Sequence, residues 1–118
     1  MNRLLYSLLL CALLAASAMT RAETSMDEEI DYLLAAVAGS GCMFIRNGKE
    51  SEAAAAVDHL QMKRKRGKRY YSSTEEFIER IASSSSWSGK PYFIACGEMD
   101  PTPIKDWYLT VLAEFRSK

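Results

Sequence analysis

The sequence has little of what metal centres require. Among its 118 residues there is one histidine, His59, and there are three cysteines, which lie far apart. A site that holds a metal through closely spaced cysteines and histidines is therefore not expected. We predict neither a metal nor another cofactor.

The chain also lacks an excess of charge of either sign, because 15 basic residues balance 15 acidic ones. This balance gives no indication of binding to nucleic acid, and no nucleic-acid partner is predicted. The charges are unevenly distributed, however. An acidic segment at residues 23–31 contrasts with a strongly basic run at residues 63–69.

No apolar run is long enough to cross a membrane. The longest, residues 4–16, would form about 20 Å of helix, whereas a bilayer core is about 30 Å thick. A basic start precedes this run and small residues follow it, which is the layout of a secretory signal peptide. We assign residues 1–22 to this signal peptide and expect it to be cleaved after Ala18 or after Ala22. A single domain, residues 23–118, would then be exported to the periplasm by a Sec-type route, with no membrane span left.

Cleavage would remove Cys11 and leave Cys42 and Cys96. Two cysteines in an exported protein favour a disulfide. The alternative, a pair of metal ligands, lacks further ligands in the sequence.

Four stretches have the hydrophobic periodicity of helices. Capping boxes at residues 25–28 and 73–76 mark the starts of the first and third helices. Ser51 is predicted to cap the second helix. Thr102 and Pro103 are predicted as the N-cap and first residue of the last helix.

Two short segments, residues 42–46 and 91–96, are predicted to be extended, and Asn47-Gly48 is predicted to form a turn. Antiparallel pairing of these segments would bring the two cysteines together. The expected fold is therefore mainly α (α+β), with about four helices, a small two-stranded β element and one disulfide.

The serine run SSSSWSGKPY, residues 83–92, has none of the usual catalytic spacings. It is not G-x-S-x-G or a P-loop, and Trp87 replaces the serine that an S-x-x-K motif would need before Lys90. It is interpreted as a helix end, with Trp87 packed beneath its hydroxyls and Gly89 reversing the chain. A binding loop, or a serine nucleophile, remains as an alternative.

Three further features have two interpretations each. His59 and Lys63 share one helix face, and they either bind an anion or pack within the fold. Arg46 either holds a group of the fold or faces a ligand. The basic run either complements a helix dipole or meets anionic lipid, cell-wall polymer or an acidic protein.

The stretches GCMFIRNG, AAAAVDHLQMK and STEEFIERIASSSSWSGKPYFI, in this order, resemble the YfeK-like family of small exported bacterial proteins, a domain of unknown function. The resemblance covers about residues 30–94. It implies a periplasmic single domain without an assigned activity, and it supplies no catalytic or binding residues. The positions that form the family pattern here are Arg46, Asn47, His59, Lys63, Ser85, Ser86, Gly89, Lys90 and Tyr92.

The first functional hypothesis is a non-enzymatic binding or accessory protein of the cell envelope, whose partner is an envelope protein or an anionic envelope component. No catalytic residue is assigned. The alternative is a small periplasmic hydrolase or transferase that pairs His59 with one of the serines at 83–86. In a third interpretation the polar residues serve folding alone. The candidate binding surface consists of Arg46, Asn47, His59, Lys63, Ser85, Ser86, Ser88, Lys90 and Tyr92.

Overall fold

A computed structural model describes residues 23–118, so the expected signal peptide lies outside the described residues. Helices dominate this part of the chain, as predicted. The third predicted helix is a short α-helix that continues as a π-helical segment. The helical elements are α2 (Met26–Gly39), α3 (Ala53–Arg66), the 3-10 turn η1 (Lys68–Tyr70), α4 (Thr74–Phe77), η2 (Ile78–Ala82) and α5 (Ile104–Arg116).

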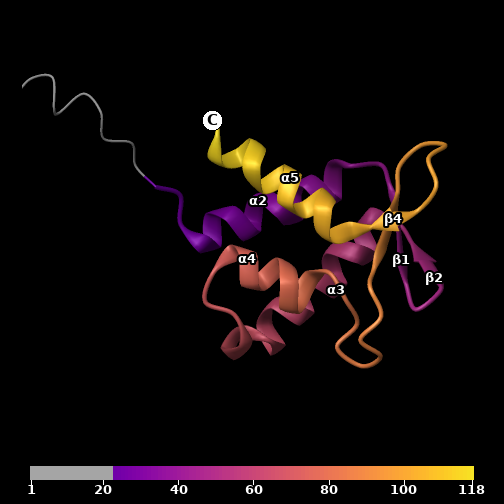
Figure 1. The fold of residues 1–118 in the computed structure, drawn as a ribbon, viewed down its shortest axis with the longest axis horizontal. Helices are drawn as coiled ribbons and strands as arrows, with labels where there is room; N and C mark the ends of the chain where they lie inside the picture. The colour runs from indigo at the N-terminus through magenta and orange to yellow at the C-terminus, as the bar shows by residue number, and fades with distance from the viewer. Residues whose placement is uncertain (1–22) are drawn as a thin grey trace, which may run out of the picture.

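The β element is a four-stranded antiparallel sheet in the order β2-β1-β3-β4, larger than the two strands predicted. The predicted pair is its centre, where Phe44 lies opposite Ile94. The strands are β1 (Met43–Arg46), β2 (Lys49–Ser51), β3 (Phe93–Ala95) and β4 (Thr102–Pro103). In Figure 1 the sheet closes one end of the helical layers.

Two predicted helix caps are confirmed and two are wrong. Ser25 and Ser73 each accept a hydrogen bond from a backbone N–H three residues on, as N-cap residues do. Ser51 instead lies in β2, where its hydroxyl donates to the carbonyl of Phe44, and α3 begins after Glu52. Thr102 pairs with Ile94 in the sheet, so α5 begins only at Ile104.

The hydrophobic core lies between α2 and the elements around it. α2 packs against α3, α4 and α5, and α5 also packs against η2 (Figure 1). Burial of this apolar surface supplies the main driving force for folding. The largest fully buried side chains are Ile30, Leu33, Val37, Phe77, Ile78, Ile104 and Tyr108.

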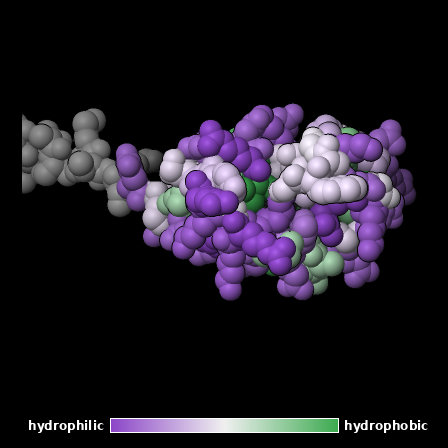
Figure 2. All heavy atoms as spheres, turned by 90° about the horizontal axis from the view of Figure 1, so that it is seen from below, coloured by the Kyte–Doolittle hydropathy of each residue, from purple (hydrophilic) through white to green (hydrophobic). Residues whose placement is uncertain are grey.

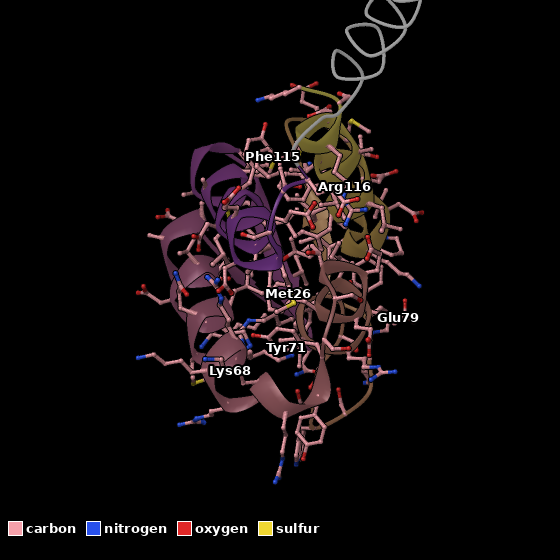
Figure 3. All side chains as sticks on the ribbon, turned by 90° about the vertical axis from the view of Figure 1, so that its left-hand side faces the viewer. Met26, Lys68, Tyr71, Glu79, Phe115 and Arg116 are labelled. Carbon is pink, nitrogen blue, oxygen red and sulfur yellow. A yellow bond between two sulfur atoms is a disulfide. The ribbon has the colours of Figure 1, made fainter. Side chains whose placement is uncertain are left out.

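A buried acidic side chain, Glu29, connects the helices at the end of the molecule opposite to the sheet. Glu29 of α2 accepts hydrogen bonds of 2.7 and 3.0 Å from Arg116 of α5 and one of 2.6 Å from Thr74. Figure 3 labels Arg116, seen from the left-hand side of Figure 1. These hydrogen bonds, chiefly that of Arg116, lower the pKa of Glu29 from its ordinary 4.5 to about 2.

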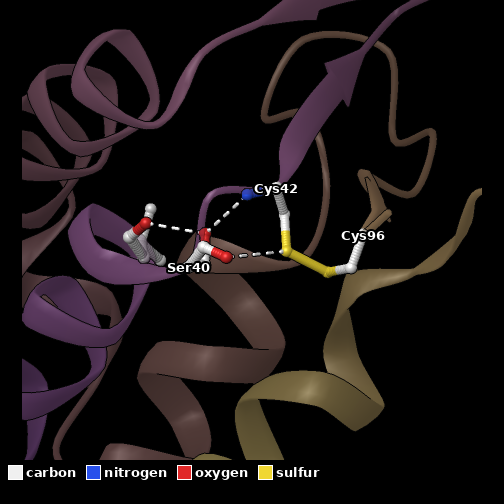
Figure 4. Close-up of a disulfide and its surroundings, with 4 residues drawn as sticks. Ser40, Cys42 and Cys96 are labelled. Carbon is white, nitrogen blue, oxygen red and sulfur yellow. Dashed lines mark hydrogen bonds between the residues drawn. A yellow bond between two sulfur atoms is a disulfide. The ribbon is translucent and has the colours of Figure 1, made fainter. Parts of the chain in front are cut away.

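The predicted disulfide between Cys42 and Cys96 is present, with the two Cα atoms 4.4 Å apart. It joins the residue before β1 to the residue after β3. Ser40 braces this corner, because its hydroxyl accepts from the Cys42 N–H at 3.1 Å and donates to the Val37 carbonyl at 2.9 Å (Figure 4). The disulfide therefore holds the two central strands, β1 and β3, together at one end.

Within residues 23–118, no helix combines the length and the apolar character that crossing a membrane requires.

Candidate functional site

An open groove of about 720 Å³ lies where the helical layers meet the loop after η2. Residues of α3 and η2 form its sides, and Arg46 at the end of β1 and Tyr92 before β3 lie at its base. Seen from below the view of Figure 1, most of the surface is hydrophilic, with a small hydrophobic patch among near-neutral and polar residues (Figure 2).

Four predicted site residues form one hydrogen-bonded cluster at the groove. The Arg46 guanidinium Nη1 lies 3.0 Å from Nε2 and 3.1 Å from Nδ1 of His59. The Tyr92 hydroxyl lies 3.3 Å from His59 Nε2 and accepts a hydrogen bond of 3.1 Å from Lys63 Nζ. Lys63 also donates to the carbonyl of Ser84 at 2.7 Å. Residues from α3, β1 and the loop between η2 and β3 are thereby joined by hydrogen bonds.

The local sequence explains this placement. His59 and Lys63 are four residues apart on α3 and share one face of the helix, as predicted. Arg46 is directed to that face because the Asn47-Gly48 turn, with φ of +50° and +77°, ends β1 in a tight hairpin to β2. The predicted turn is therefore confirmed, and it sets the position of Arg46.

Burial and mutual repulsion govern the charges in this cluster. Burial, with the nearby charges of Arg46 and Lys63, lowers the pKa of His59 from 6.5 to about 4, so the imidazole is neutral at pH 7. Burial and the charge of Arg46 lower the pKa of Lys63 from 10.5 to about 8. Lys63 therefore stays mostly charged at pH 7 although it is only 7% exposed.

The groove is rich in cations and has no acidic residue in its lining. Arg66 and Arg80 line it together with Arg46 and Lys63. Arg80 pairs with Glu76, but among the described residues no ion pair includes Arg46, Lys63 or Arg66. Removing a charge from water without a counter-ion costs free energy, so the buried Lys63 and the half-buried Arg46 favour an added anion.

Another residue of the basic run, Arg64, forms ion pairs within the fold. Arg64 pairs with Asp27 and Asp31 of α2 at 3.4 and 2.7 Å, which joins the basic run to the acidic first segment. The uneven charge distribution therefore has a partly structural role. Lys65 and Lys68 remain exposed outside the groove.

The serine run forms a braced loop at the rim of the groove. Its backbone is closed by hydrogen bonds from the Ser85 N–H to the Lys90 carbonyl and from the Gly89 N–H to the Ser85 carbonyl, both 2.9 Å. Gly89 has a φ of +74°, which confirms the predicted glycine turn. The buried Ser85 hydroxyl accepts from the backbone N–H groups of Trp87 and Ser88.

Asn47 attaches this loop to the β1–β2 turn. Its side-chain amide donates to Ser85 Oγ at 3.3 Å and accepts from Ser88 Oγ at 2.6 Å. The prediction that Trp87 packs beneath the serine hydroxyls is wrong, because its side chain is 93% exposed. The loop pairs most of its polar groups, although the buried Ser83 hydroxyl has no hydrogen-bond partner among the described residues, and it leaves the indole on the surface.

Most of the predicted surface is brought together by the fold. Ser86 lines the groove, whereas Ser88 and Lys90 lie on the same loop outside the groove lining. The predicted surface omitted the residues that complete the lining: Met62, Arg66, Gly67, Tyr70, Arg80, Ile81 and Trp87. Arg66 lies three residues after Lys63 on the same helix face, within the basic run that was predicted as one possible contact for an anionic partner.

The geometry supplies no pair for a serine nucleophile. Within the described part of the chain, the side-chain hydrogen bonds of His59 go to Arg46 and Tyr92 and none reaches a serine. A nucleophilic serine needs a base within hydrogen-bond reach. Residues 23–118 also contain no cluster of three or more His, Cys, Asp or Glu side chains that could hold a metal ion.

Comparison with known proteins places the chain among uncharacterised relatives. Residues 24–116 match the family of unknown function DUF5329. Uncharacterized protein YfeK of Salmonella typhimurium is 43% identical over 49 residues, which are 42% of this chain and 41% of that protein. The match thus spans about two fifths of the length of the relative. No solved structure matches the chain significantly. Because the family match covers nearly all of the described residues, the chain belongs to the DUF5329 family, a YfeK-like family of unknown function.

Proposed function

We propose that this protein is a non-enzymatic envelope protein that binds an anionic component in the groove lined by Arg46 and Lys63. One observation carries the proposal. Two cations, one buried and one half-buried, face the same groove without a carboxylate partner among the described residues. Keeping such charges uncompensated is costly for folding, and an anionic ligand would offset that cost.

Two further features support an exported location. The sequence of residues 1–22 has the layout of a signal peptide. The Cys42–Cys96 disulfide suits an oxidising compartment such as the bacterial periplasm. We therefore propose that the mature protein acts in the periplasm, where phosphate- and carboxylate-bearing polymers are available as ligands.

The proposal predicts binding of simple polyanions that depends on the groove. Tripolyphosphate and triglutamate are titrated by calorimetry into protein purified from the periplasm. The Lys63→Met and Arg46→Gln substitutions are each expected to weaken binding about tenfold or more, because each removes a charge-assisted hydrogen bond. The matched control is Lys65→Met, which removes an exposed cation of α3 that lies outside the groove.

The pH dependence provides a second readout. A bound anion favours the charged form of Lys63, whose pKa in the free protein is about 8. Affinity should therefore fall as the pH rises from 7 to 9, and Lys63→Met should remove most of this decrease. Absence of binding by both anions, or an equal loss in Lys65→Met, would contradict the proposal.

A further inference from the structure

We infer that the anion bound in the groove is an acidic saccharide, whose sugar ring stacks on the exposed indole of Trp87. The inference rests on the proposed anion-binding function and specifies its ligand. Three features of the groove carry it: an exposed tryptophan on a braced loop, a lining that extends along α3, and cations placed along that length.

Folding does not account for the position of Trp87. Its side chain is 93% exposed, so it contributes almost nothing to the core. Tryptophan and tyrosine are enriched among the residues that contribute most of the free energy of binding at interaction surfaces. The loop that carries it is held by Ser85 and by Asn47, as described above. A loop backbone held in this way loses little conformational freedom when a ligand stacks on its indole.

The chemistry of this rim suits a sugar ring. The face of an aromatic ring is electron-rich and attracts weakly positive groups, such as the C–H groups on one face of a pyranose. Tyr70 lines the same groove and is 53% exposed. Its hydroxyl accepts a hydrogen bond of 2.9 Å from Arg69. Hydroxyl and amide groups from Tyr92, Ser86 and Asn47 add hydrogen-bonding partners for sugar hydroxyls.

The shape of the groove suits more than one ring. Its α3 lining runs from His59 to Arg66, a rise of about 10 Å at about 1.5 Å per residue. Lys63 and Arg66 lie on successive parts of this length, and Arg80 faces them from η2. An acidic saccharide carries its charges at intervals along an extended chain, which matches this spread of cations.

A peptide ligand fits the groove less well. Peptides often add a strand to a sheet edge, but no residue of the edge strands β2 or β4 lines the groove. A helical peptide needs a row of apolar contacts, and the aliphatic lining is limited to Met62 and the buried Ile81. The exposed indole and the cations are therefore better explained by a charged ring compound.

The test compares ligands that separate charge from ring structure. Trigalacturonate has three rings and three carboxylates, galactotriose has three rings without charge, and triglutamate has side-chain carboxylates without rings. Trigalacturonate is expected to bind at least about fivefold more tightly than either. ADP is included because a nucleobase also stacks on tryptophan.

Substitution of Trp87 provides the matched variants. Trp87→Ala should weaken trigalacturonate binding about tenfold and change triglutamate binding less than about twofold, while Trp87→Phe should restore part of the loss. Trp107→Phe leaves Trp87 as the only tryptophan of the chain. In that background, trigalacturonate should shift the Trp87 fluorescence.

The outcomes separate the inference from the proposed function. Equal affinity for trigalacturonate and triglutamate, or tighter binding of ADP, would overturn the saccharide and leave anion binding intact. Equal binding of galactotriose would show that charge is not recognised and would overturn both. Failure of every anion to bind would also overturn both.

Discussion

At the scale of single residues, Glu29 is a buried charge that connects α2 to α4 and α5. It is 4% exposed and receives hydrogen bonds from Arg116 and Thr74. Glu29→Gln should lower the free energy of unfolding by about 1–3 kcal/mol, because the amide loses the charge-assisted bonds. Urea denaturation at pH 7 measures the change. Glu28→Gln, an exposed neighbour on the same helix turn, is the control and should have little effect.

The lowered pKa of Glu29 predicts that the stability of the protein depends on pH. The folded pKa of Glu29, about 2, lies below its ordinary 4.5. Its contribution to stability is therefore complete above pH 4.5 and is lost as the pH falls through 2. The difference in stability between the natural protein and Glu29→Gln should narrow over this range. A difference that stays constant from pH 7 to pH 2 would contradict the assigned role.

Sequence reasoning found the site residues that share a local pattern. His59 and Lys63 are four apart on one helix, and Arg46 precedes a recognisable Asn-Gly turn. It missed Arg80, which reaches the groove only through the packing of η2 against α3. The role of Glu29 was equally hidden, because its partner Arg116 is 87 residues away in the chain.

At the scale of elements, the helices were predictable and the outer strands were not. Apolar periodicity identifies long helices well, but β2 and β4 are short and mostly exposed. Their assignment depends on pairing with β1 and β3. Ser51 and Thr102 are good N-cap residues by type, yet both are used in the sheet. The Asn47-Gly48 turn was the signal for β2, because such turns join two strands.

The junction between α3 and η1 allows a sharp test of packing. A Cβ atom at Gly67 would lie 2.5 Å from Ile81 Cδ1 and 3.0 Å from the Lys63 carbonyl oxygen. Gly67→Ala should therefore destabilise the protein by about 1–3 kcal/mol through overpacking. Thermal unfolding followed by circular dichroism measures the loss.

Shortening the neighbouring side chain should relieve part of this clash. Ile81→Val removes the Cδ1 atom, so the double variant should be more stable than the sum of the two single effects implies. Gly39→Ala, where a Cβ meets nothing within 4 Å, is the matched control. Strict additivity of the Gly67 and Ile81 substitutions would show that the two sites do not compete for space.

At the scale of the whole molecule, the disulfide connects stability to the site. Cys42 and Cys96 are 54 positions apart, and they hold β1 and β3, which are continuous with Arg46 and Tyr92. The two cysteines were predicted to pair from their number and from the strands beside them. What the sequence left open was how the helices close over these strands to form the groove.

Removal of the disulfide should cost much of the stability of so small a domain. In the chain-entropy model, a bridge with a separation of 54 residues stabilises by about 4 kcal/mol. Replacement of both cysteines by serine should therefore lower the melting temperature and the affinity for anions together, because the base of the groove loses its anchor. Treatment of the natural protein with a reductant should reproduce both losses and should leave the double serine variant unchanged. Treatment with reductant thus serves as the control for the substitutions.

Two outcomes would contradict this prediction. Full stability of the double serine variant would mean that packing alone holds the sheet. A double serine variant with a lower melting temperature but unchanged affinity for anions would show that the groove forms independently of the disulfide.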